Sequence, residues 1–93
     1  MYRITTTRGF RKALKRYRQS GKFREEKLER VVDMLAFGER LPAACRDHGL
    51  QGAMADFREC HILPDLLLVY RVLEKELILV LVDLGTHDEL FGR

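Results

Sequence analysis

Residues 57–91 read FRECHILPDLLLVYRVLEKELILVLVDLGTHDELF and contain both long apolar runs of the chain. The runs Leu66–Leu73 and Leu77–Val82 are so dense in Leu, Val and Ile that they predict buried strands rather than an amphipathic helix. Residues 74–76, Glu-Lys-Glu, leave room only for a hairpin between them, so the two strands should be antiparallel.

A third strand is expected over residues 53–61, just before these two. Pro64 can neither continue a strand nor donate a ladder hydrogen bond, so the chain should turn at residues 62–64. Side chains alternate between the two faces of a strand, which places Glu59 and His61 on the same face.

The register of the three strands predicts where polar side chains gather. The short hairpin pairs Leu73 with Glu76. The same register sets Asp65 opposite Leu84, and the preceding turn sets His61 beside Asp65. Polar groups should therefore meet at one end of the sheet, where the segment after the last strand also begins.

The first half of the chain predicts a strand followed by two helices. A short strand is expected at Arg3–Thr6, and Thr7 is placed to cap a helix that starts at Arg8. The apolar stripe of that helix consists of Phe10, Ala13, Leu14 and Tyr17. After Ser20-Gly21, a second helix has the stripe Leu28, Val31, Val32 and Leu35.

These elements define the fold class. The order is β-α-α-β-β-β, with a short helix or turn at about Asp88–Phe91. We therefore expect one α+β domain over residues 1–93, in which a helical hairpin packs on one face of an antiparallel twisted sheet.

The composition is that of a small globular domain, with 46% hydrophobic and 33% charged residues. No apolar run is long enough to span a membrane and no signal-peptide core is present, so the cytoplasm is the expected location. Cys45 and Cys60 are too few and too far apart for a zinc or redox motif, and we interpret them as reduced, packed thiols.

Charge is distributed unevenly along the chain. The first 46 residues hold 13 Lys/Arg against 5 Asp/Glu, and the remaining residues hold 4 against 9. The segment 8–24 contains eight basic residues and no acidic one. Candidates for contact with a phosphate backbone or an acidic protein are Arg11, Lys12 and Lys15. The alternative is that the two halves neutralise each other and this helix face is merely solvated.

Three histidines, all expected in loops or at strand ends, are the side chains best suited to proton transfer near neutral pH. Their spacing matches no metal-ligand pattern and no Gly-rich phosphate loop follows a strand, so neither metal nor cofactor is expected. The only serine, Ser20, ends a helix away from them, which argues against a nucleophilic hydrolase. RNA suits the remaining proton-transfer chemistry because its 2′-hydroxyl is an internal nucleophile.

Short segments from residue 41 onward carry a family resemblance. They are Leu41-Pro42, Asp47-His48-Gly49-Leu50-Gln51-Gly52, Phe57-Arg58-Glu59-Cys60-His61, Pro64-Asp65, Val69-Tyr70, Gly85-Thr86-His87 and Leu90-Phe91-Gly92. In this order and spacing they resemble the YafQ branch of the RelE/ParE superfamily, the toxins of bacterial type II toxin–antitoxin modules.

The resemblance implies a ribosome-dependent endoribonuclease that cuts messenger RNA without a metal and is neutralised by a small, partly disordered antitoxin of the DinJ or RelB type. The positions that match the family's catalytic set are His48, His61, Asp65 and His87. Phe91 matches an aromatic residue near them, and Glu59 an acidic one. Our interpretation makes His87 and His61 the acid and base, with orienting or relay roles for Asp65 and His48.

Two positions depart from the family pattern. Leu66 stands where the family commonly has an aromatic residue, and Asp83 stands where it has an arginine. Arg58 or Arg71 could supply the missing positive charge, or activity could be reduced. The alternative to a nuclease is a toxin of the same fold that acts on gyrase or the ribosome by binding alone, which does not need three histidines.

Overall fold

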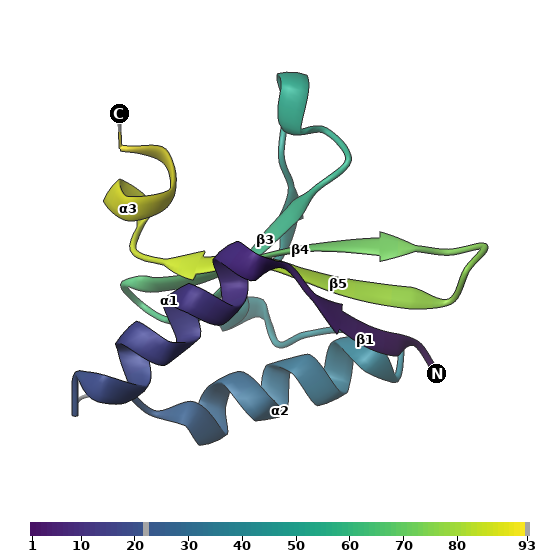
Figure 1. The fold of residues 1–93 in the computed structure, drawn as a ribbon. Coiled ribbons are helices and arrows are strands. Elements are labelled where there is room, and N and C mark those ends of the chain that lie inside the picture. Colours follow the sequence, from purple (N-terminus) through teal and green to yellow (C-terminus); the bar gives the residue numbers. More distant parts are fainter. Residues whose placement is uncertain (22, 93) are drawn as a thin grey trace.

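The N-terminal half forms the expected strand and helices. The computed structural model describes residues 1–21 and 23–92. Its first elements are β1 (Arg3–Thr6), α1 (Arg8–Gln19) and α2 (Glu25–Ala36). The Thr7 hydroxyl accepts a hydrogen bond from the Phe10 N–H at 3.0 Å, so Thr7 caps α1 as predicted. The two helices diverge from their connection, as Figure 1 shows.

The C-terminal half forms four strands and three short helical segments. They are the 3₁₀ turn η1 (Ala43–Cys45), β2 (His48–Gly49), the 3₁₀ turn η2 (Gly52–Met54), β3 (Arg58–Leu63), β4 (Leu66–Leu73), β5 (Ile78–Gly85) and α3 (His87–Phe91). Strand β4 has the predicted bounds. The strand predicted at residues 53–61 is wrong at both ends, because left-handed Gly52 (φ 64°) starts η2 and delays pairing until Arg58.

The strands make one sheet in the order β1-β5-β4-β3-β2. Strands β2 to β5 are antiparallel to their neighbours, but β1 pairs with β5 in parallel. The prediction of a fully antiparallel sheet is therefore wrong at this edge. All other elements except α3 lie between β1 and β5 in the chain, so no hairpin turn forces these two strands to run in opposite directions.

The predicted register is displaced. Leu73 pairs with Ile78 rather than with Glu76, because residues 74–77 form a longer turn in which Leu77 is left-handed (φ 57°). His61 pairs with Leu67 and does not lie beside Asp65, since β3 continues to Leu63. The longer turn moves the register by two residues and a bulge in β5 after Leu81 adds one more, so Leu84 lies opposite Leu68 instead of Asp65.

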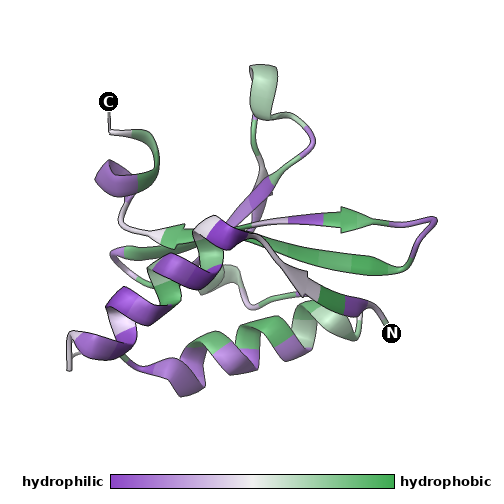
Figure 2. Ribbon diagram, viewed as in Figure 1, coloured by the Kyte–Doolittle hydropathy of each residue, from purple (hydrophilic) through white to green (hydrophobic). Residues whose placement is uncertain are grey.

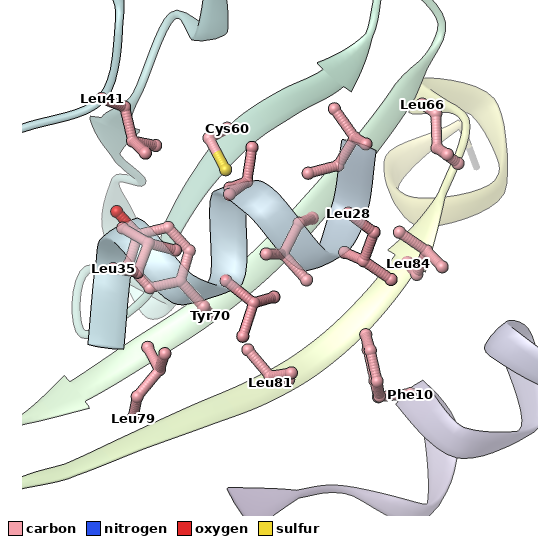
Figure 3. Close-up of a cluster of buried hydrophobic side chains, with 14 of the residues drawn as sticks. Phe10, Leu28, Leu35, Leu41, Cys60, Leu66, Tyr70, Leu79, Leu81 and Leu84 are labelled. Atoms are coloured by element: carbon pink, nitrogen blue, oxygen red, sulfur yellow. The ribbon is translucent and has the colours of Figure 1, made fainter. Parts of the chain in front are cut away.

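The core lies between the sheet and the two long helices (Figure 3). Its largest fully buried side chains are Tyr70, Leu68, Leu79, Leu84 and Cys60. Figure 2 shows the hydrophobic residues concentrated along the strands and on one side of α2. Both cysteines are free thiols, and burial raises the pKa of Cys60, in agreement with the predicted packed thiols.

The opposite face of β4 is also covered, since Leu67 and Val69 are each only 2% exposed. Burial on both faces explains why β4 reads as a continuous apolar run rather than an alternating one. The β2–β3 connection and helix α3 lie on this side of the sheet, away from α2 (Figure 1).

Candidate active site

Two cross-strand rows bring the predicted site residues to the face opposite the helices. In the first row His48 pairs with Glu59, Glu59 with Val69, and Val69 with Asp83. In the second row His61 pairs with Leu67, and Leu67 with Gly85. Paired residues point to the same face, so His48, Glu59 and His61 share the face that the core does not use.

Both ring nitrogens of His48 lie close to acceptor oxygens. Its Nδ1 lies 2.7 Å from the carbonyl oxygen of Arg46, and its Nε2 lies 3.3 Å from Oε2 of Glu59. Arg46 aims that carbonyl from a left-handed backbone conformation (φ 48°), which is uncommon for a non-glycine residue. A carbonyl oxygen only accepts, so Nδ1 of His48 is the donor in the contact with Arg46, and Nε2 is turned toward the carboxylate of Glu59.

Glu59 is the one residue of the site that is deeply buried. It is 6% exposed, and within the described residues its second oxygen, Oε1, is buried without a hydrogen-bond partner. Burying a carboxylate oxygen without a hydrogen-bond partner costs folding free energy. Such unsatisfied groups are uncommon, and a functional role is one explanation for them. The sequence places Glu59 in the site but gives no sign of its burial.

His61 and His87 approach from the two sides of β4. His61 is half-buried on β3, whereas exposed His87 begins α3 just beyond Gly85. Two strand spacings separate the His61 and Gly85 positions, about 10 Å. The His87 ring lies 5.4 Å from the ring of Phe91, at a tilt of 54°, so the predicted aromatic neighbour is brought to His87.

Asp65 lies in the β3–β4 turn and is exposed. It lines a cavity of about 300 Å³ together with Tyr17, Phe23 and Thr86. Asp65 therefore lies at the end of the sheet where α3 begins, but not in the register beside His61 that the sequence predicted.

Arg58 is not brought to this face. It pairs with Tyr70 on the core side, donates to the Tyr70 hydroxyl at 3.2 Å, and lies 3.3 Å from Asp47. The Tyr70 hydroxyl in turn donates to Asp47, and burial followed by this hydrogen bond raises the pKa of Tyr70. Arg71 is the better-placed cation, because it alternates with Val69 onto the site face.

The basic residues of α1 do not all have the same role. Arg11 donates to the carbonyl and hydroxyl oxygens of Thr6, each at 2.9 Å, and so fastens α1 to β1. Lys12 and Lys15 are exposed. Lys12 also lines a groove of about 310 Å³ that contains Asp83 on β5.

Two residues of α1 and α3 were missed by the sequence analysis. The Tyr17 hydroxyl donates to Oε1 of Glu89 at 2.5 Å, and Glu89 forms a capping box with Thr86. The spacing Thr86-His-Asp-Glu89 is a readable capping-box signal just before an apolar pair. The partnership with Tyr17 is not readable, because the two residues lie 72 positions apart.

Neither a metal cluster nor a membrane-spanning helix was found in the part of the chain that the structure describes. No three His, Cys, Asp or Glu side chains of residues 1–21 and 23–92 come together as possible metal ligands. The His48–Glu59 pair supplies only two. Within the same ranges, no helix has both the length and the apolarity needed to cross a bilayer.

Comparison with known proteins identifies the family. The family model described as "Bacterial toxin of type II toxin-antitoxin system, YafQ" matches residues 2–92. The chain belongs to the YafQ toxin family. It is 42% identical over 52 residues to the mRNA interferase toxin YafQ of Escherichia coli K12. That match spans 56% of this chain, and about half (54%) of the E. coli protein's length.

Solved structures of bacterial toxins share the whole fold. The metal-bound toxin from Helicobacter pylori is 45% identical, with a TM-score of 0.90 over 98% of this chain and 100% of the other. The E. coli DinJ–YafQ complex contains a chain that is 30% identical, with a TM-score of 0.87 over 99% and 100% of the two chains. The α+β architecture is therefore that of the family.

Proposed function

We propose that this YafQ-family chain is an endoribonuclease toxin that cuts messenger RNA on the ribosome. The observation that carries the proposal is the gathering of His48, Glu59 and His61 on one sheet face, with His87 at its end. The name of the E. coli relative, an mRNA interferase, supports the same substrate class. We also propose a cytoplasmic location, because ribosomes translate messenger RNA there.

The reaction needs one base and one acid. The base takes the proton of the 2′-hydroxyl as that oxygen attacks phosphorus, and the acid protonates the departing 5′-oxygen. The products are a 2′,3′-cyclic phosphate and a 5′-hydroxyl. His61 and His87 are suited to these roles, because among the described residues neither ring is engaged in a hydrogen bond or an ion pair.

His48 is suited to a different role. Both of its ring nitrogens are already engaged, so it is not free to exchange a proton with substrate. Held between the Arg46 carbonyl and the Glu59 carboxylate, its ring is suited to orient substrate rather than to act as the acid or the base. Asp83 lies at the other end of the same cross-strand row, three strand spacings or about 14 Å away. No step of this reaction requires a metal. Asp65 and Phe91 would lie beside the bound RNA.

The exposed basic residues of α1 fit the partners. Lys12 and Lys15, together with Arg11, present a cationic face on which a polyanionic ribosome or an acidic antitoxin finds complementary charge. The E. coli relative has been solved in complex with DinJ. We propose a small antitoxin of the same kind for this chain.

The test is single-turnover cleavage of ribosome-bound messenger RNA by folded variants. His61→Ala and His87→Gln should each lower the rate by about 10² or more. Glu76→Gln, exposed at the far hairpin, is the matched control and should cleave normally. If both histidine variants keep full cleavage, the assignment of His61 and His87 as acid and base is wrong. If neither the parent chain nor any variant cleaves and all still arrest translation, the protein is a toxin that acts by binding alone.

A further inference from the structure

Helix α3 carries His87 and Phe91 but has only five residues. A helix this short is not stable by itself in water, so its position has to be imposed by contacts with the rest of the chain. The orientation of His87 therefore depends on what holds α3 against the sheet.

Glu89 makes several of those contacts. Its Oε1 accepts from the Thr86 N–H at 2.9 Å, and its own N–H donates to the Thr86 hydroxyl at 3.1 Å. The same Oε1 accepts from the Tyr17 hydroxyl at 2.5 Å, while Oε2 lies 3.8 Å from Nη2 of Arg16. One carboxylate thus closes the cap of α3 and ties it to α1.

The end of β5 is shaped to admit this carboxylate. A Cβ atom on Gly85 would lie 2.8 Å from Oε1 and 3.2 Å from Cβ of Glu89, closer than side chains normally approach. Gly85 has no positive φ, so the need for glycine here is space rather than backbone conformation.

Tyr17 is itself fixed on the α1 side. Its ring lies 5.9 Å from that of Phe23, and the Arg16 guanidinium lies 5.4 Å from the centre of its ring. Burial and the hydrogen bond to Glu89 raise the pKa of Tyr17 to about 12, and that hydrogen bond lowers the pKa of Glu89. Near neutral pH the donor therefore keeps its proton and the acceptor keeps its charge.

We propose that Tyr17 and Glu89 are positioning residues for His87, a clasp that sets the angle of α3 and hence where the histidine meets the scissile phosphate. The proposal rests on the nuclease function proposed above. Helix α1 would then have two roles: it presents a cationic face, and through Tyr17 it fixes the position of His87.

The decisive variant is Tyr17→Phe, which keeps the ring beside Phe23 and removes only the hydroxyl. The matched control is Tyr2→Phe, because the Tyr2 hydroxyl makes an equivalent bond to Glu74 (3.0 Å) at a site remote from α3. In Tyr17→Phe, kcat should fall by about tenfold to 10²-fold with little change in KM, since misplacement affects the chemical step more than binding. Tyr2→Phe should leave both unchanged.

Hydrogen exchange gives a readout that does not depend on activity. The Leu90 amide donates to the Thr86 carbonyl at 3.0 Å inside α3. Its exchange should accelerate by about tenfold in Tyr17→Phe and not in Tyr2→Phe. Glu89→Gln, which keeps an acceptor oxygen, should retain slow exchange and most of the activity, whereas Glu89→Ala should lose both.

The proposal is wrong if Tyr17→Phe and Tyr2→Phe have the same Leu90 exchange rate and the same kcat. Faster exchange with unchanged kcat would also overturn it, since α3 would then be held by Tyr17 without consequence for the reaction. If the parent chain cleaves no RNA, the proposed nuclease function fails; the exchange comparison would still decide whether Tyr17 holds α3.

Discussion

Nε2 of His48 lies 3.3 Å from the carboxylate of Glu59, a buried side chain whose other oxygen has no partner among the described residues. The two residues pair across β2 and β3, so the strand register itself holds them together. An exposed histidine and a buried carboxylate therefore form one structural unit in the site.

Substitution Glu59→Gln tests this unit. The amide has nearly the same shape but no negative charge, so the side chain can no longer attract His48 as a carboxylate does. We expect a folded protein with an unchanged or higher melting temperature, because a buried charge is removed, and cleavage slower by about tenfold or more. Thermal unfolding and single-turnover cleavage measure the two effects. Unchanged cleavage would show that Glu59 is not part of the reacting site.

Gly85→Ala should damage the site without touching a histidine. The added methyl group would occupy space 2.8 Å from Oε1 of Glu89 and would push that carboxylate out of the capping box. Gly9→Ala is the matched control, because a Cβ there has ordinary contacts at 3.8 Å and 3.9 Å inside helix α1. Gly9→Ala should raise the free energy of unfolding by about 0.5–1 kcal/mol. Cleavage should fall in the first variant only.

Asp83 should oppose the binding of a polyanion. Its Oδ1 accepts from the Leu84 N–H at 2.8 Å, and it lines one groove with Lys12 and Arg16. Asp83→Asn keeps an acceptor oxygen but removes the negative charge, so binding to ribosomes should tighten, most clearly at low salt. Lys12→Ala should weaken binding and reduce the salt slope by about 1 if Lys12 contacts a phosphate. Titrations at several salt concentrations would refute this if neither variant changed affinity.

Alkaline pH should loosen the contact between α1 and α3. The pKa of Tyr17 is raised from 10.0 to about 12, so this group stabilises the folded state fully below pH 10. Its contribution is lost as the pH rises from 10 to about 12, because the unfolded state releases this proton there while the folded state still holds it. Absorbance of tyrosinate should therefore develop later in the native than in the urea-unfolded protein. Tyr17→Phe should remove one of the late-titrating groups; a native titration centred near pH 10 would contradict the assignment.

The sequence by itself determined the local elements. Helix α1 and its Thr7 cap, the buried stripe of α2 and the whole of β4 follow from periodicities that act within a few residues along the chain. Residue type likewise determined which groups have proton-transfer chemistry to offer. These predictions succeeded because dihedral preference, capping and apolar spacing depend on near neighbours.

Only the tertiary structure decided which groups meet. The bulge after Leu81, the left-handed Gly52 and the longer hairpin changed the register, and with it the partners of His61 and Asp65. The face taken by Arg58 and the burial of Glu59 followed from the same pairing. Tyr17 and Glu89 meet across 72 positions because α1 and α3 pack at one end of β5. Such contacts arise from the packing of whole elements against each other, and no local pattern in the sequence encodes them.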